Sequence, residues 1–349
     1  MGVTMAVLHK CPGTRLGAQL PTMGSILWCT WDSKTWRNHG RHLNSPRAAA
    51  SLRDNSRDRL SGLGYPSGVP FAVDTKNAAA VEHHLSGEFA VVFPGMDPGE
   101  VRRVLQWVID AFGGRNPGFH ALDTPYHDLS HTLEVTLCLM TLIRRWAARG
   151  VQPACSEESV RWALIASLLH DSGYLRTHDD TEGTGAKYTV IHVDRSADLA
   201  GVLTQSMGFA DPAVRAIRAM IQCTALGVKV SEVAFDTPEL GFLGRALGAA
   251  DLLAQMAARD YLDKLPLLYR EFVESAQHQE RFGRKGQTFT SVEDLLGKTP
   301  GFWRFYALPR IQTDLDGVHR FLEDPVTGRN DYLEAVEANI GRLEGRSGS

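Results

Sequence analysis

Residues 126–146 read YHDLSHTLEVTLCLMTLIRRW, a polar opening that runs into a long apolar segment. The apolar residues recur at helical spacing, which predicts a helix over about 127–149. His127 and His131 stand four residues apart in the opening, and side chains at that spacing share one face of a helix. The pair therefore either lies in solvent at a helix N-terminus or belongs to a metal site. In the second case the other metal ligands have to come from elsewhere in the chain.

Two further stretches of the sequence could supply those ligands. An apolar helix, expected over about 157–171, ends in the sequence WALIASLLHDSGYLR and carries His170 and Asp171 at its end. An unpaired charge after so apolar a helix is costly, so Asp171 needs a cation. Asp251 is the only acid between Leu240 and Arg259, within a run of Ala, Leu and Gly. Such a lone carboxylate is readily explained as a metal ligand, the alternative being a pair with a buried arginine.

Helical patterns dominate the rest of the chain. They cover about 97–114, 192–208, 212–225, 238–278 with a break near Leu265-Pro266, 301–323 and 330–344. Residues 260–272 have Leu and aromatic residues at helical spacing and are expected to pack in the core. The best candidate for a strand is GEFAVVFPG (87–95). We therefore expect an all-α catalytic domain over 96–345, a short irregular segment over 66–95 and a disordered tail over 1–65.

Composition excludes several classes of protein. With 43% hydrophobic and 22% charged residues the chain is typical of a globular protein, and no apolar run reaches the ~20 residues that span a bilayer. Residues 1–60 carry nine Lys/Arg against three Asp/Glu, while the whole chain has a net charge of -3. The residues after position 60 are therefore acidic overall. This argues against a nucleic-acid partner, because proteins that bind nucleic acid present a basic face. The five cysteines form no C-x-x-C pair, which favours a reducing compartment and a cytoplasmic location.

The basic N-terminal region leaves alternatives open. It is rich in Arg and poor in acids, as transit peptides are, so the protein could instead be targeted to an organelle. Translation upstream of the true start is a further alternative to a flexible tail.

The order of His131, His170-Asp171 and Asp251 resembles that of the HD-domain superfamily of metal-dependent phosphohydrolases. The opening Y-H-x-x-x-H looks most like the cyclic-nucleotide phosphodiesterase branch, and the resemblance covers about 125–262. It implies an HD-domain-like helical bundle with one well-supported divalent metal, either Mg, Mn, Zn or Fe. The implied ligands of that metal are His131, His170, Asp171 and Asp251. His127 would donate a proton to the departing oxygen, and His192, which opens a helix, would contact the substrate phosphate or a second metal.

Three positions depart from the pattern of that branch. Tyr174 stands where a histidine usually follows the His-Asp pair, and Asp128 replaces an asparagine. The helical stretch AIRAMIQCTALG (216–227) also lacks the paired histidines of relatives that bind two or three metals. A second metal site therefore stays open at this point.

The resemblance and the chemistry of these residues predict a metal-dependent phosphohydrolase. Two imidazoles and two carboxylates on a divalent ion leave positions for water and a phosphoryl oxygen. We expect metal-activated water to cleave a small-molecule phosphoester or nucleotide, with His127 as general acid. A phosphodiester such as a cyclic nucleotide is the expected substrate. The alternatives are an HD-fold di-iron oxygenase and a non-catalytic sensor that binds a nucleotide.

Overall fold

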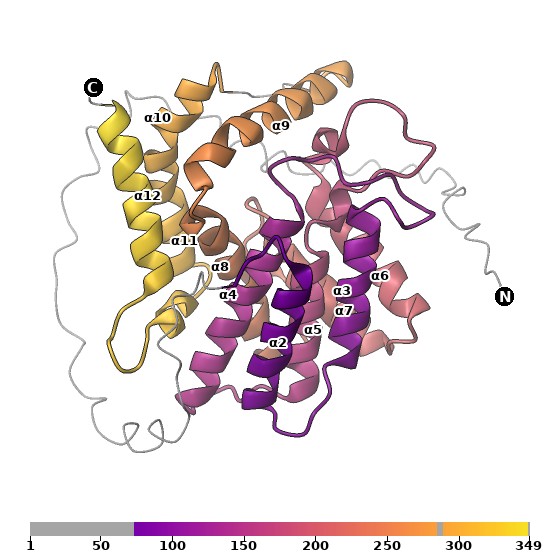
Figure 1. Cartoon of the computed structure of the whole chain (residues 1–349), viewed down its shortest axis with the longest axis vertical. Coiled ribbons are helices and arrows are strands. Elements are labelled where there is room, and N and C mark those ends of the chain that lie inside the picture. The colour runs from indigo at the N-terminus through magenta and orange to yellow at the C-terminus, as the bar shows by residue number, and fades with distance from the viewer. Residues whose placement is uncertain (1–72, 285–288, 348–349) are drawn as a thin grey trace.

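The computed structural model describes residues 73–284 and 289–347, and every regular element in these ranges is a helix (Figure 1). The only strand-like pairing among them is an isolated bridge between Phe119 and Thr177. The prediction of an all-α fold is confirmed. The tail expected over 1–65 lies outside the described residues. No helix in the described part of the chain combines the length and the apolar character that crossing a membrane requires.

The α-helices are α2 (Ala78–Val92), α3 (Gly99–Phe112), α4 (Leu129–Ala148), α5 (Glu157–Leu169), α6 (His192–Ser206), α7 (Asp211–Gln222), α8 (Pro238–Ala257), α9 (Tyr261–Arg281), α10 (Val292–Phe302), α11 (Leu308–Gln312) and α12 (Asp331–Ser347). Short 3₁₀ turns cover Ser172–Tyr174, Gly185–Tyr188, Val230–Glu232 and Val318–Leu322, and a π-helical segment covers Trp303–Ala307 between α10 and α11. Capping side chains begin several helices where the sequence places them. Asp128 accepts from the backbone N–H of His131 at 2.8 Å, and Ser156 accepts from that of Ser159 at 3.2 Å.

The centre of the molecule is formed by α4, α5 and α8, which pack against one another. Helix α2 covers α4, α3 covers α5, and α12 lies along α8, while α9 crosses one end of the bundle (Figure 1). Helix α8 is buried around almost its whole circumference, and its small residues permit this. A Cβ added to Gly248 would lie 2.6 Å from the carbonyl oxygen of Cys223. Asp251 thus lies on a closely packed helix, with 13% of its side chain exposed.

The segment over 66–95 differs from the expectation of an irregular stretch with a possible strand. Its described part contains α2, which includes residues 87–92 of the expected strand. Val81, Leu85 and Phe89 recur every four residues and are all buried. They form one apolar stripe that packs against the rest of the core. Tertiary burial of this stripe thus outweighs the preference of its valines and phenylalanines for strands.

Two predicted helix boundaries were also wrong. The break expected near Leu265-Pro266 falls instead at residues 258–260, and Pro266 lies within α9. Asn339 donates from Nδ2 to the carbonyl oxygens of Met256 and Ala258 at 2.8 and 3.0 Å, which satisfies carbonyl groups at the buried C-terminal end of α8. The helix expected over 301–323 instead ends at Gln312, after α10, the π-helical segment and α11 have run without a break from Val292, and a left-handed Gly317 precedes the 3₁₀ turn Val318–Leu322.

Candidate metal and catalytic site

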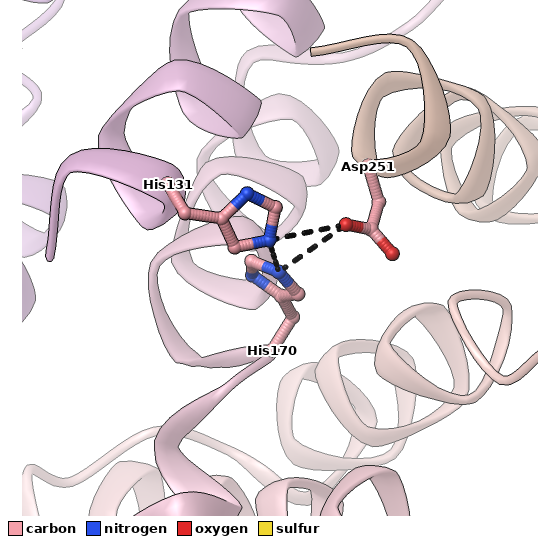
Figure 2. Close-up of side chains that lie close together, drawn as sticks. All are labelled: His131, His170 and Asp251. Carbon is pink, nitrogen blue, oxygen red and sulfur yellow. Dashed lines mark hydrogen bonds and ion pairs between the residues drawn. The ribbon is translucent and has the colours of Figure 1, made fainter. Parts of the chain in front are cut away.

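Three helices bring their side chains to one point. His131 comes from the first turn of α4, His170 caps the C-terminus of α5, and Asp251 lies in the middle of α8 (Figure 2). Their nearest nitrogen and oxygen atoms all lie within 4.8 Å of one another. Nε2 of His131 is 3.4 Å from Nε2 of His170 and 3.3 Å from Oδ1 of Asp251. Residues separated by up to 120 positions in the chain therefore form one cluster.

Asp171 completes this cluster from the loop that follows α5. Its Oδ2 lies 3.3 Å from Nε2 of both His131 and His170, and no hydrogen bond is directed at this buried oxygen. The backbone N–H of Gly173 donates to Oγ of Ser196 at 2.8 Å, which ties the loop to α6. A Cβ at Gly173 would lie 2.0 Å from the carbonyl oxygen of His192, so only glycine permits this close approach. All four predicted ligands therefore meet.

The cluster attracts positive charge. Burial acts to lower the pKa of His131, but Asp171 and Asp251 outweigh burial and raise this pKa to about 9. The pKa of His170 is raised well above its ordinary value by the same two carboxylates, again against burial. Burial acts to raise the pKa of both carboxyl groups, yet the imidazoles hold each pKa below its usual range. Either protons or another cation must balance the two carboxylates.

These side chains fit a divalent metal ion. Nδ1 of His170 donates to the carbonyl oxygen of Ser167 at 2.7 Å, so in the neutral ring Nε2 carries the lone pair that faces the cluster. Two imidazole nitrogens and two carboxylate oxygens then converge, and all of them are electron-pair donors. The unpartnered Oδ2 of Asp171 points to the same conclusion, because a buried charged oxygen without a donor is costly.

His192 lies on the other side of Asp171. Its Nδ1 donates to the carbonyl oxygen of Thr189 at 2.7 Å, and its Nε2 lies 3.6 Å from Oδ1 of Asp171. Burial lowers the pKa of His192, so the ring is neutral near pH 7 and its Nε2 is an acceptor that faces another acceptor. Nε2 of His192 and Oδ1 of Asp171 can together bind a cation or a hydrogen-bond donor, but these two atoms make a smaller ligand set than the four atoms of the cluster.

His127 stands one turn before His131 and is held by a residue that the sequence analysis missed. Its Nδ1 lies 2.5 Å from Oε2 of Glu271, which also accepts from the backbone N–H of Tyr126 at 2.7 Å. A carboxylate only accepts, so Nδ1 of His127 is protonated and Nε2 is the nitrogen available for other partners. The His127 ring lies 5.8 Å from that of His131, centroid to centroid. Helix α9, expected to be only core packing, therefore reaches the site.

Tyr174, at the position of the expected histidine, packs against both outer imidazoles. Its ring stacks on His127 with centroids 4.7 Å apart and on His192 with centroids 4.5 Å apart. Burial raises the pKa of its phenol well above the ordinary value, so the side chain stays neutral. Tyr174 therefore shapes the site without supplying charge or a readily ionised ligand.

The other two departures are explained locally. Asp128 caps α4 and lies 3.3 Å from Nζ of Lys264, so its carboxylate serves the helix terminus. Gln222, in the helix that lacks histidine, donates to Oδ1 of Asp194 at 3.0 Å. Within residues 73–284 and 289–347, His131, His170 and Asp251 are the one group of three or more potential ligands that lies this close together.

Comparisons with known proteins support the same architecture. A family model described as Npun_R2479-like matches residues 118–344, which include every side chain of the site. The phosphodiesterase domain of the RhoPDE fusion protein from the choanoflagellate Salpingoeca rosetta has a similar structure, with a TM-score of 0.53 and 17% sequence identity. The similarity covers 83% of this chain and 98% of that one, and it shows that the two share a fold. No curated protein matches the chain.

Proposed function

Because the chain belongs to the Npun_R2479-like family and has the fold of a phosphodiesterase domain, we propose that its metal-binding cluster hydrolyses a phosphoester. The observation that carries the proposal is the convergence of His131, His170 and Asp251, whose potential ligand atoms all lie within 4.8 Å of one another. Asp171 adds a fourth electron-pair donor at 3.3 Å from both imidazoles. A divalent ion held there would activate water and neutralise the charge of a phosphoryl group.

His127 is proposed as the general acid. The contact of its Nδ1 with Glu271 fixes the ring and leaves Nε2 as the nitrogen from which a proton would pass to the leaving oxygen. Tyr174 stacks against this ring and limits its rotation. His192 would hold a weakly bound second ion beside Asp171 or, when protonated at Nε2, donate to a phosphoryl oxygen.

The substrate proposed is a phosphodiester, with a cyclic nucleotide as the first candidate. The test is a screen of the purified protein against cyclic nucleotides, nucleotides and generic phosphodiesters, each with Mg²⁺, Mn²⁺, Zn²⁺ or Fe²⁺, with identification of the products. We expect hydrolysis that requires one of these ions and is abolished by chelation. Tight binding of a nucleotide without any product would instead establish the sensor alternative.

The metal content and visible absorbance of the purified protein separate a di-iron oxygenase from a hydrolase. An oxygenase of this kind needs ligands for two irons, and the position beside Asp171 offers only His192 as a further imidazole. We expect aerobically purified protein to lack the visible absorbance of a two-iron centre and to bind one tight metal per chain. An iron content near two per chain, with that absorbance, would favour the oxygenase.

A further inference from the structure

Asp251 is itself held by a residue one helical turn later. Nε2 of Gln255 lies 3.1 Å from the backbone carbonyl oxygen of Asp251 and 3.3 Å from its Oδ1. Oδ1 is also the atom that faces Nε2 of His131 at 3.3 Å and Nε2 of His170 at 3.7 Å. The Gln255 amide therefore contacts the same carboxylate oxygen that points into the cluster.

The orientation of this amide follows from its neighbours. Both oxygen atoms of Asp251 near Gln255 can only accept, so the NH₂ group must face them. Oε1 of Gln255 then faces Tyr126, whose hydroxyl group donates to it at 3.0 Å. The three residues form a directed chain in which Tyr126 donates to Gln255 and Gln255 donates to Asp251.

Tyr126 also connects this chain to the proposed general acid. It is 2% exposed, and its backbone N–H donates to Oε1 of Glu271 at 2.7 Å. Glu271 in turn holds Nδ1 of His127. The side chain of Tyr126 therefore serves the metal ligand on α8, while its backbone serves the residue on α9 that holds His127.

We infer that Gln255 is a positioning residue for Asp251 and that the Tyr126 hydroxyl group sets its orientation. The inference rests on the proposed metal function. Without Gln255 the short Asp251 side chain could rotate between positions on its helix, and binding of the ion would have to select one of them. Outer hydrogen bonds to metal ligands typically affect affinity by about 10–100-fold.

The first experiment measures metal affinity. Full-length wild type and Gln255→Met are titrated with Mn²⁺ by calorimetry, with Gln205→Met, an exposed position on α6, as the matched control. Methionine has a similar length and helix propensity but no amide group. We expect Gln255→Met to bind Mn²⁺ about 10–100-fold more weakly, while Gln205→Met matches wild type. Hydrolysis by Gln255→Met should recover as Mn²⁺ is raised, because its defect lies in occupancy of the metal site.

The second experiment tests the role of Tyr126. Tyr126→Phe removes only the hydroxyl oxygen, so it perturbs packing far less than Gln255→Met does. We expect a weakening of about tenfold, at the low end of outer-shell effects. In Gln255→Met the hydroxyl group has lost its acceptor, so adding Tyr126→Phe should change Mn²⁺ affinity little further. Such non-additivity marks direct coupling of the two side chains.

The outcomes separate this inference from the proposed function. If wild type binds Mn²⁺ and hydrolyses a phosphoester while Gln255→Met has the same Mn²⁺ affinity, the positioning role is wrong and the proposed function stands. Additive effects of the two variants would remove Tyr126 from the chain. If Gln255→Met loses its helical circular dichroism, an unchanged affinity in Tyr126→Phe overturns the coupling instead. A wild type that binds none of Mn²⁺, Zn²⁺ or Fe²⁺ overturns the inference and the proposed function together.

Discussion

Nδ1 of His127 lies 2.5 Å from Oε2 of Glu271, whose side chain is 1% exposed. The two residues are 144 positions apart in the chain, and their contact leaves Nε2 of His127 as the nitrogen available for chemistry. This relationship separates His127 from its neighbour His131, which faces Asp171 and Asp251 instead. Substitution of His127 and substitution of His131 should therefore have different effects on metal content and turnover.

The substitution His127→Ala should keep the metal and lose about 10²–10⁴-fold in turnover, the usual contribution of a general acid. The loss should be smaller for a p-nitrophenyl phosphodiester, because p-nitrophenolate departs without a proton. Turnover of both substrate types is measured beside that of His83→Ala, an exposed control on α2. An equal loss for both substrates, or an empty metal site in His127→Ala, would contradict the proposed role.

Glu271→Gln tests the support of that histidine. The amide keeps the size of the carboxylate, but its NH₂ group lies within reach of Nδ1 and cannot accept a hydrogen bond from it. Turnover should therefore fall, by no more than the loss expected for His127→Ala, which is about 10²–10⁴-fold. Glu271→Ala should also destabilise the fold by about 1–3 kcal/mol, since it leaves the buried N–H of Tyr126 without a partner. Kinetics and urea unfolding measure the two effects. Glu280→Gln, exposed on the same helix, is the control and should match wild type in both.

Asp171→Ala and Asp251→Ala should each lower the bound metal and abolish hydrolysis. Most helicity should remain, because the core extends well beyond these two side chains. Elemental analysis of metal per chain and far-UV circular dichroism are the measurements, with Asp198→Ala on the exposed face of α6 as control. Unchanged metal content in both variants would remove these residues from the ligand set.

The variant His192→Ala should retain the tight metal, since Nε2 of His192 faces Oδ1 of Asp171, whereas His131 and His170 face Oδ2. It should raise KM for the phosphoester or the concentration of added Mn²⁺ that activates hydrolysis. Steady-state kinetics at several Mn²⁺ concentrations distinguish these two effects. Kinetics identical to wild type at every concentration would assign His192 a structural role.

Metal affinity should increase with pH. In metal-free protein the pKa of His131 is raised from 6.5 to about 9, so its protonated form stabilises the fold. That contribution is fully present below pH 6.5 and is lost as the pH rises through about 9. A divalent ion competes with these protons, so Mn²⁺ binding should strengthen between the same limits and release protons. Thermal unfolding in chelator and Mn²⁺ titrations at both pH values measure this, and equal affinities at both would show that no proton is displaced.

The sequence by itself determined most of the helical segments and which side chains are candidate ligands. Apolar periodicity is a local property, and it predicted α4, α5, α6 and α7 to within a few residues. The cost of burying a charge is nearly as local. An acid after an apolar helix, or alone among Ala and Leu, needs a cation wherever the helix packs. His131, His170, Asp171 and Asp251 could be selected on that ground together with the family resemblance.

Only the tertiary structure decided which distant residues support these candidates. Glu271 occupies an apolar-stripe position between the buried Leu268 and Ser275, which was a sequence signal, but such an acid can equally well turn toward solvent. Gln255 is an ordinary helix residue until the hydroxyl group of Tyr126, 129 positions away, fixes its amide. Hydrogen bonds of this kind depend on where helices cross and how their side chains are rotated. Those quantities are set by packing of the whole core, so no local pattern in the chain records them.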